Sequence, residues 1–585
     1  MGIFNSVPAP LIKRSKHNLS FPNRFSAKFG KVYPVMSRKV IPGDRFKFQA
    51  QTFVQFQAMS TKVFQEFVCR QAFFFVPSRL LWDDFEDFYS VNETENYIHP
   101  YFDYRQIVQL GHAKHGSIFD YFNLPTFQYP DDYQYSEDWQ TYAAQNWVDS
   151  DSRHRVWNIV HNNDPLIYHY DALKILAFVK IYADWYADEN LQSELADWKV
   201  IHQDIQEAIQ EGNGNITSYI INLAIDWDKG VYNKAYPKDY FTGALPFAQK
   251  GPQVNIPFTG TGGVTTWLTS GSYNVNGSFE SVFTDPSFKS DAPDSNFPYL
   301  AAETLRSKTD NSTPAGIRRF VTFNNGLTSL ENLRSAMMLQ SFYERNARSG
   351  TRYKETILAH FGVLTPDARL DRSQFIQDNY TPVTLGSVYS TSANSDGSGI
   401  TGEPVSTATG AGYSRRRKFK IDEHGYIISL WCCYPRASYY KGVEREWMEL
   451  DKFDYFWPDF QHLGEQEVKI AELSLGNKQP ERPEMQQDGE TFGYNPRYSQ
   501  YKVALPQIHG DFRFIRKAMS AARDIPYGVS LSKHFIQIDP SFNNLNRVFN
   551  YTEDDYDSID VDVFIRILAH RPMSFFGIPR FFSQL

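Results

Sequence analysis

Cysteine is scarce in this chain, with only Cys69, Cys432 and Cys433 among 585 residues. An odd and small number excludes a disulfide framework and fits a reducing compartment. Cys432 and Cys433 are adjacent in the apolar run IISLWCCYP, where the alternation of a strand sends neighbouring side chains to opposite faces. We therefore expect buried thiols in a sheet and not a redox pair.

Long hydrophobic runs and cofactor motifs are also missing. No stretch reaches the roughly 18 apolar residues of a membrane-spanning helix, and the N-terminus shows no apolar signal region. The chain has no Walker-type phosphate loop, no H-E-x-x-H and no cysteine pair at zinc spacing. The GSGITG at 397–402 lacks the flanking strand and helix of a dinucleotide site, and His112 with His115 makes an incomplete metal site. We expect neither a cofactor nor a metal.

Positive charge is in deficit, since the chain carries a net charge of −8. That average argues against a chain devoted to wrapping nucleic acid. The basic residues nevertheless cluster as IKRSKHN near the N-terminus and as SRRRKFK at 414–420. Either cluster alone is more typical of a solvated surface, but both can meet phosphate even on an acidic chain.

Aromatic residues, in contrast, are abundant at 16% of the chain, and many lie in strand-like patterns. Residues 45–59, RFKFQAQTFVQFQAM, place apolar side chains on one parity and mostly polar ones on the other, which predicts a long strand with one buried face. The next segment, VFQEFVCRQAFFFVP, is apolar on both faces toward Pro77. The tail returns to strands in KFKIDEHGYIISLWCCYP and SIDVDVFIRILAHRPM. The pattern indicates a large antiparallel sheet.

The middle of the chain has helical spacing. Residues 171–191 and 194–212 carry apolar stripes, and a capping-box pattern at Thr328 predicts a further helix that ends before Gly350. Residues 250–315 and 387–413 are poor in apolar side chains and are typical of long surface loops. Strands at both ends with helices between favour one sheet-based domain with insertions over about four separate domains.

A cluster of carboxylates follows the apolar strand in FFFVPSRLLWDDFEDF, residues 73–88. Its members are Asp83, Asp84, Glu86 and Asp87. A catalytic pair would need one carboxyl shifted by burial or by a like charge. We expect instead the exposed first turn of a helix, where carboxylates meet the positive end of the helix dipole.

Several blocks of residues occur along the chain in a fixed order. They read PGDRFKFQAQTFVQFQAM, FFFVPSRLLWDDFEDF, DYFTGALPFAQKGPQV, ERNARSGTRYKETILAHFGVLTPDARL, HGYIISL, DYFWPDFQHLGEQEV and AHRPM. These blocks, in matching order, resemble the major capsid protein of microviruses, which are small icosahedral bacteriophages with single-stranded DNA. The resemblance is closer to the gokushovirus-like branch.

The resemblance implies a mainly β fold, a viral jelly roll of eight antiparallel strands in two packed sheets with large helical and loop insertions. We therefore expect an N-terminal basic arm and one jelly-roll capsid domain that holds a helix-rich insertion, a surface-loop insertion and a flexible loop. The expected bounds are 1–26 for the arm, 27–585 for the domain, about 79–240 and 255–315 for the two insertions, and 387–413 for the flexible loop.

The resemblance also implies a function and a set of partners. It implies self-assembly into a T=1 shell of sixty identical subunits around single-stranded DNA, without enzymatic activity. The expected partners are a small basic DNA-binding peptide, minor virion or scaffolding proteins and a host cell-surface receptor. Residues 255–315 are the candidate threefold protrusion that meets the host. The expected location is the virion, assembled in the host bacterial cytoplasm.

Two groups of basic residues are our candidates for contact with the DNA. The N-terminal group is basic, contains proline and lacks periodicity, so we expect it on the inner surface; it comprises Lys13, Arg14, Lys16 and Arg24. The second group can contact DNA or pair across a subunit interface; it comprises Arg415, Arg416, Arg417 and Lys418.

Two other classes of function stay open on the residues alone. A β-rich carbohydrate-active enzyme would use exposed aromatic rings to stack on sugars and paired acids to cleave glycosidic bonds. A receptor-binding spike protein would form a trimer or a pentamer. Particle size separates both from a capsid subunit.

Overall fold

The structure is a computed structural model, and it describes eleven stretches of the chain. They are residues 14–90, 97–162, 164–226, 232–248, 330–349, 358–362, 366–367, 371–389, 404–476, 488–550 and 557–575. The chain divides into two compact units, one formed by Met1–Ala248 with Ala347–Leu585 and the other by Gln249–Asn346. All that follows concerns the first unit, unless stated otherwise.

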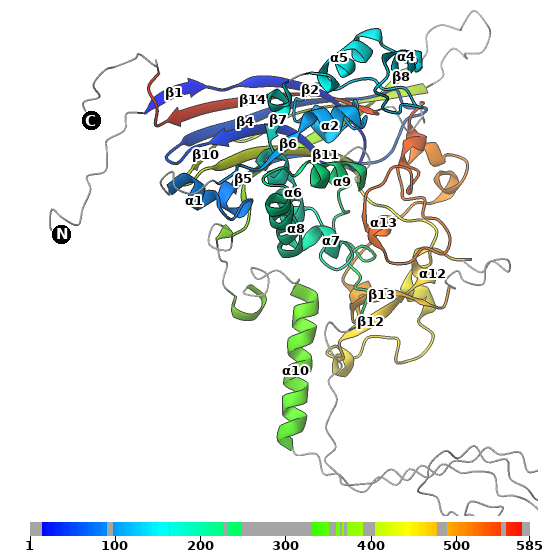
Figure 1. Ribbon diagram of the computed structural model, residues 1–585. Coiled ribbons are helices and arrows are strands. Elements are labelled where there is room, and N and C mark those ends of the chain that lie inside the picture. The colour runs from blue at the N-terminus through cyan, green and yellow to red at the C-terminus, as the bar shows by residue number, and fades with distance from the viewer. Residues whose placement is uncertain are drawn as a thin grey trace, which may run out of the picture. The chain divides into compact units, whose positions relative to one another are not determined.

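One continuous antiparallel sheet forms the centre of this unit; it curls into two halves, which we call the two sheets and which are joined where β9 pairs β8 (Figure 1). In one sheet the strand order is β2, β14, β4, β9, with β1 also pairing β14 and β10 pairing β4; in the other it is β3, β11, β5, β8. The bounds are β1 Ser15–Asn18, β2 Phe21–Ala27, β3 Tyr33–Val40, β4 Arg45–Phe56, β5 Phe67–Pro77, β8 Gln374–Tyr389, β9 Pro404–Tyr413, β10 Arg417–Lys420, β11 Gly425–Pro435 and β14 Ile559–Arg571. Chain neighbours are thus distributed between two sheets, and the jelly-roll expectation is confirmed.

The core between the sheets follows from side-chain alternation. In β4 the side chains of Phe46, Phe48 and Val54 are buried, and the residues between them face outward. Strand β14 alternates in the same way. Strand β11 differs, because every one of its residues is buried. That difference shows that β11 is covered on both faces.

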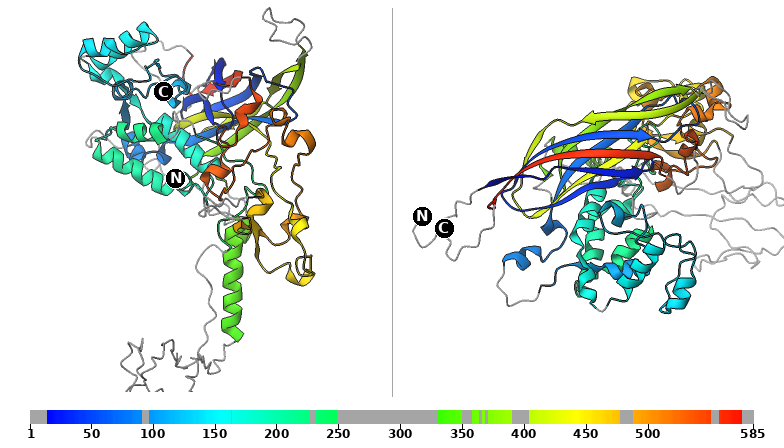
Figure 2. Two further views of the ribbon diagram at one scale, coloured as in Figure 1. Left: turned by 90° about the vertical axis from the view of Figure 1, so that its right-hand side faces the viewer. Right: turned by 90° about the horizontal axis from the view of Figure 1, so that it is seen from above.

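The helical insertion supplies this second cover. Helix α6 (Leu173–Trp185) packs on β5 and β11 and buries nearly all of its residues. Seen from above, the helices lie on one side of the two sheets (Figure 2). The remaining elements are α1 Phe85–Ser90, β6 Tyr101–Asp103, α2 Tyr104–Gln109, α3 Ile118–Tyr121, α4 Trp139–Ala144, α5 Ser150–Val160, β7 His169–Asp171, α7 Ser193–Ala196, α8 Trp198–Glu211 and α9 Thr217–Asp226.

Local sequence explains where these helices begin. Asp103, Asp138, Asp149 and Asp197 precede α2, α4, α5 and α8, and each side chain accepts a hydrogen bond from a backbone N–H of the first turn. Such N-caps satisfy donors that the helix itself leaves unpaired. The helix predicted over 194–212 is divided at Asp197 into α7 and α8, and Ile201, Ile205 and Ile209 of its predicted apolar stripe are buried in α8.

A second, smaller core is formed mostly by residues after Ala437, together with a short stretch around Phe241. It packs Phe241, Tyr439, Val468, Phe492 and Phe535. Its regular elements are β12 Glu465–Lys469, α12 Ile470–Leu473, β13 Thr491–Pro496 and α13 Lys533–Ile536. Short 3-10 turns occur at Ser78–Leu80, Pro165–Tyr168, Arg445–Met448, Pro458–Phe460, Ser499–Tyr501, Gly510–Arg513, Lys517–Met519 and Leu545–Val548.

Several segments differ from their expected structure. Residues 15–18 and 21–26, expected in an arm before the first strand, lie in β1 and β2, because they pair with β14. Much of the expected 387–413 loop belongs to β8 and β9, which pair with each other. The expected surface loop 255–315 lies outside the described residues. The helix predicted before Gly350 is α10, Leu330–Ser349, most of which belongs to the second unit.

Candidate nucleic-acid interface

The outer face of the β1–β14–β4–β10 sheet is open, since none of the described helices covers it. Every second side chain of β4 and β14 points outward there, and the view from above shows these strands uncovered (Figure 2). We call this surface the open face. The register of the paired strands determines which outward side chains lie next to one another, so the open face consists of rows of neighbouring side chains that cross the strands.

The first row on the open face is basic across four strands. Lys16 of β1 lies opposite His570 of β14, His570 lies opposite Arg45 of β4, and Arg45 lies opposite Lys420 of β10. Directly opposed residues of an antiparallel pair have Cβ atoms about 5 Å apart. Strands from opposite ends of the chain thus build one positive row.

The next row continues the positive charge. Lys47 of β4 lies opposite Leu568 of β14 on one side and Lys418 of β10 on the other. The pKa of His570 lies below its ordinary value, because partial burial and the adjacent Lys16, Lys47 and Arg45 all disfavour the imidazolium ion. We call the five cations of these two rows the basic rows; they are Lys16, Arg45, Lys47, Lys418 and Lys420.

Exposed aromatic rings lie farther along the same face. Phe564 of β14 and Tyr413 of β9 both lie opposite Gln51 of β4, and Phe53 is the next outward residue of β4. Phe564 is 40% exposed, Tyr413 78% and Phe53 46%. Arg566, which lies between Phe564 and Leu568 in the outward parity of β14, is exposed as well. We call Phe53, Phe564 and Tyr413 the aromatic row.

Carboxylates limit the positive surface at two places: Lys420 of the basic rows forms an ion pair of 2.6 Å with Asp422, and further carboxylates lie at the far end of β14. Arg24 of β2 lies opposite Asp562, and the two charges form an exposed ion pair of 3.4 Å. Asp560 accepts a hydrogen bond of 2.8 Å from Gln57. The pKa of Asp560 is raised by burial and by the neighbouring Asp557. The positive region is therefore the end of the sheet that holds the basic rows.

The structure separates the eight candidate DNA-contacting residues into groups. Lys16 and Lys418 come from different clusters of the sequence, and the register brings them onto the open face. The positive charge of Arg24 is partly neutralised by its ion pair with Asp562. Arg14, Arg415, Arg416 and Arg417 are exposed, with Arg417 on the opposite parity of β10 from Lys418, and Lys13 lies outside the described residues.

Several residues of this surface were not among the candidates predicted from the sequence. They are Arg45, Lys47, Lys420, Arg566 and His570, with Phe53, Phe564 and Tyr413 as the aromatic part. The signal was available for β4, whose alternation already places Arg45 and Lys47 on the polar parity. Nothing local to the sequence pairs β4 with β14 and β10.

The carboxylate cluster after β5 has the surroundings of a surface turn. Glu86 and Asp87 lie in the first turn of α1, as expected, and Asp83 and Asp84 precede it. The Asp83 carboxylate lies 3.4 Å from His202 of α8. This contact fits a structural role in which the segment before α1 is held against α8.

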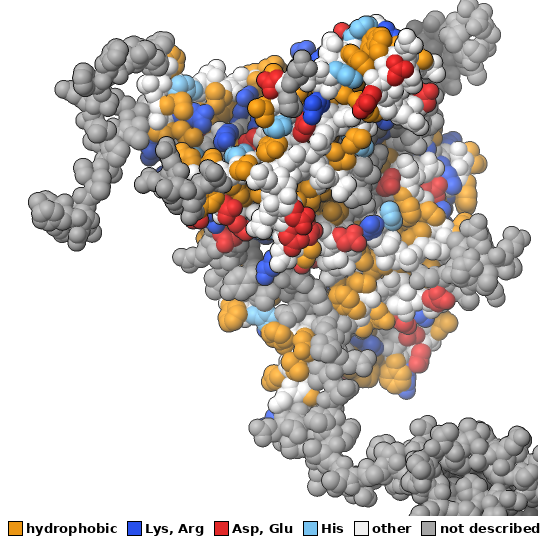
Figure 3. Space-filling model, viewed as in Figure 1, with side chains coloured by type: hydrophobic (Ala, Val, Ile, Leu, Met, Phe, Trp, Pro, Cys, Tyr) orange, Lys and Arg blue, Asp and Glu red, His pale blue; other side chains and the backbone are white. Residues whose placement is uncertain are grey.

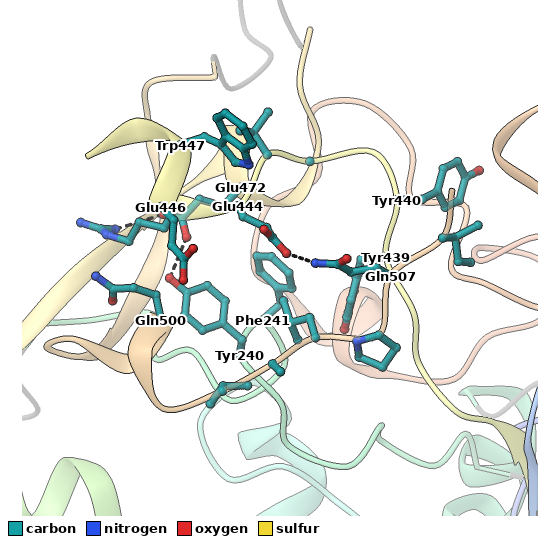
Figure 4. A pocket seen from close by; sticks show the side chains of 18 of the residues that line it. Tyr240, Phe241, Tyr439, Tyr440, Glu444, Glu446, Trp447, Glu472, Gln500 and Gln507 are labelled. Atoms are coloured by element: carbon teal, nitrogen blue, oxygen red, sulfur yellow. Dashed lines mark hydrogen bonds and ion pairs between the residues drawn. The ribbon is translucent and has the colours of Figure 1, made fainter. Parts of the chain in front are cut away.

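A pocket of about 750 Å³ lies beside the second core, lined by aromatic and acidic side chains (Figure 4). Glu472 accepts hydrogen bonds from Tyr240 (2.6 Å), Arg445 (3.0 Å) and the backbone N–H of Lys469 (2.9 Å). Burial and the adjacent Glu472 raise the pKa of Tyr240. Three donors thus hold Glu472 as a structural carboxylate and not as a free acid for glycoside cleavage.

The described residues offer no candidate for a metal centre, since they hold no group of three or more His, Cys, Asp or Glu side chains suited to a metal ion. In the same stretches no helix is long and apolar enough to cross a membrane.

Known proteins similar to this chain were found in two comparisons. A family model described as capsid protein (F protein) matches residues 5–142 and 165–581. Capsid protein VP1 of Bdellovibrio phage phiMH2K is 27% identical over 605 residues, covering 99% of this chain and 98% of that protein. The VP1 proteins of Chlamydia phage 1 (26% over 558 residues; 87% and 86% covered) and Spiroplasma virus 4 (24% over 591 residues; 97% and 95% covered) are similar as well.

Proposed function

This chain belongs to the family of phage capsid proteins described as F protein, and from that premise we propose that its copies close into an icosahedral shell around single-stranded DNA. The protein has the role of a microvirus major capsid protein. The family match along nearly the whole chain is the observation that carries the proposal. The T=1 arrangement of sixty copies, the absence of catalysis and assembly in the host bacterial cytoplasm are parts of it.

The open face is the surface that we propose to meet the genome. One sheet is covered by the chain's own helices, and the other presents the basic rows beside the aromatic row. Proteins that bind single strands without sequence preference combine a positive track for the backbone with rings on which bases stack. The open face supplies both, so it is the inner surface of the proposed shell.

Exposed apolar side chains support extensive contacts between subunits. They gather in residues 447–463, where Trp447 is 78% and Leu450 91% exposed, and Figure 3 shows hydrophobic side chains over this part of the chain. The other members are Phe453, Tyr455, Phe456, Trp457 and Leu463. Apolar surface concentrated in this way is typical of protein interfaces. We refer to residues 447–463 as the apolar segment.

The remaining partners belong to the same proposal. A shell with a net acidic subunit needs additional positive charge for condensed DNA, which a small basic peptide supplies; minor virion or scaffolding proteins assist assembly. Residues 255–315, outside the described stretches, are the proposed protrusion for a host cell-surface receptor.

Particle size tests the assembly proposal directly. Light scattering and electron microscopy of the purified protein are expected to show megadalton particles of uniform diameter. A trimer or pentamer would indicate a spike protein. Monomers under every assembly condition would contradict the capsid assignment.

A further inference from the structure

Cys69 and Cys433 meet across two strands of the sheet that the helices cover. Cys69 of β5 lies directly opposite Cys433 of β11. Their Sγ atoms are 2.7 Å apart, and both residues are buried. Cys432 lies opposite Arg70, so its side chain has the other parity. The cysteines that come together are therefore distant in the sequence, and the adjacent pair diverges as expected.

We propose that Cys69 and Cys433 are an oxidation site that closes as an intramolecular disulfide when the protein leaves a reducing compartment. Directly opposed residues of antiparallel strands have Cβ atoms about 4.5–5.5 Å apart. A disulfide needs about 3.5–4.5 Å between Cβ atoms and about 2.05 Å between sulfurs. The existing separation of 2.7 Å leaves a sub-ångström movement of each sulfur.

The oxidant in this proposal is a small-molecule disulfide such as oxidised glutathione. One cysteine thiolate attacks a sulfur of the oxidant, which forms a mixed disulfide and releases one small thiolate. The second cysteine thiolate then attacks the first cysteine's sulfur, forms the bond between Cys69 and Cys433 and releases the other small thiolate. The two protons that leave the cysteines convert the released thiolates to thiols, so two cysteine thiols are oxidised and one small disulfide is reduced.

Burial controls when this reaction occurs. Burial raises the pKa of the Cys433 thiol, and the hydrogen bond to Cys69 acts in the same direction. Because the thiolate is the reactive form, exchange in the folded protein needs a local opening of β5 and β11. A glutathione-reduced cytoplasm keeps the thiols free. The timing rests on the proposed function, since a particle released from its host meets oxidising surroundings.

The crosslink would restrain the unfolded chain strongly. The two cysteines are 364 positions apart, and a disulfide that closes a long loop removes much of the freedom of the unfolded state. Oxidised protein is therefore expected to unfold at a higher guanidinium concentration than reduced protein.

Thiol counting on the purified full-length chain tests the proposal. The protein is incubated with oxidised glutathione or with dithiothreitol, denatured in an alkylating reagent and weighed by mass spectrometry. The reduced sample is expected to carry three alkyl groups. The oxidised sample is expected to carry one, on Cys432, with the two cysteine-containing peptides linked.

Single substitutions identify the bond. C432S is expected to keep the disulfide, whereas C69S and C433S are expected to lose it. Three alkylated cysteines, or only glutathione adducts, after prolonged oxidation of the wild-type chain would overturn the proposal, as would a disulfide that survives C69S. The wild-type experiment requires neither a folded variant nor an assembled particle, so it tests the disulfide even if the protein does not assemble into shells.

Discussion

His570 is a titratable residue of the open face that lies among the basic rows. Partial burial together with Lys16, Lys47 and Arg45 keeps its pKa below the ordinary value. Phosphate groups placed against the basic rows would reverse part of this field and raise that pKa. Binding of DNA is then coupled to uptake of a proton. Proton uptake by His570 therefore strengthens DNA binding at a pH below the pKa that His570 has in the complex. This contribution to the affinity is lost as the pH rises through that pKa.

We therefore expect the affinity for an oligothymidylate to increase as the pH falls from about 7.5 to about 5.5, across the ordinary histidine range. His570→Gln should abolish most of this increase, measured by fluorescence anisotropy at constant salt. His115→Gln is the matched control, because His115 is exposed in the helical insertion. Equal pH dependence in wild type and His570→Gln would exclude His570 as the coupled group.

Asp44 is a buried carboxylate whose hydrogen bonds are expected to stabilise the fold. Its side chain is fully buried and accepts two hydrogen bonds from Arg571, of 2.9 and 3.2 Å, and one from the backbone N–H of Ile41. Asp44 thereby ties the turn before β4 to the end of β14.

Asp44→Ala should lower the free energy of unfolding by about 2–3 kcal/mol, since a guanidinium and a backbone donor are deprived of a charged acceptor. Chemical denaturation measures this decrease. Asp562→Ala removes the exposed partner of Arg24 and should cost at most about 1 kcal/mol. Similar decreases in both variants would show that burial does not strengthen the interaction of Asp44 with Arg571.

At the scale of elements, β4 and β14 separate two kinds of side chain along the open face. The basic rows lie near the C-terminal end of β14, and the aromatic row lies closer to its middle. Charge attracts any nucleic acid, whereas bases can stack on exposed rings only where they are unpaired. The two groups should therefore respond differently to substitution.

Changing the aromatic row to leucine (Phe53→Leu, Phe564→Leu, Tyr413→Leu) should weaken single-stranded DNA binding by about tenfold or more and leave its salt dependence unchanged. Changing the basic rows to glutamine should flatten the dependence of log K on log salt, by about 0.7 for each phosphate that the protein no longer neutralises. Titrations at several salt concentrations measure both.

Duplex DNA is the control ligand for this pair of variants. The leucine variant should bind duplex as wild type does, and the glutamine variant should bind it more weakly. An equal weakening for single strands and duplex in the leucine variant would argue against stacking.

At the scale of the whole molecule, we propose that the apolar segment contributes to the contacts between subunits. Trp447 and Leu450 are far more exposed than a side chain of the described core. Anchors of this kind carry a large share of the binding energy at interfaces.

Trp447→Ser combined with Leu450→Ser is expected to give folded subunits that need about tenfold higher concentration to form particles. Analytical ultracentrifugation measures the assembly, and circular dichroism checks the fold. Val148→Ser, at an exposed site of the helical insertion, is the matched control. Particle formation at the wild-type concentration would exclude the apolar segment as an interface.

Much of this architecture is contained in local sequence. The alternation of β4 and β14, the apolar stripe of α8 and the aspartate N-caps are each encoded within a few residues. Local periodicity sets which face of an element is buried, so these features were predictable. The order of capsid-like blocks likewise indicated the jelly roll.

The tertiary structure alone decided which distant residues meet. The register of β14 with β1 and β4 brings Lys16 and Arg45 to His570, and β10 adds Lys418. The same kind of pairing places Cys433 beside Cys69. The physical reason is that a strand's pattern specifies its buried face but not its partner. The partner is chosen by the packing of two whole sheets, in which strands hundreds of residues apart become neighbours.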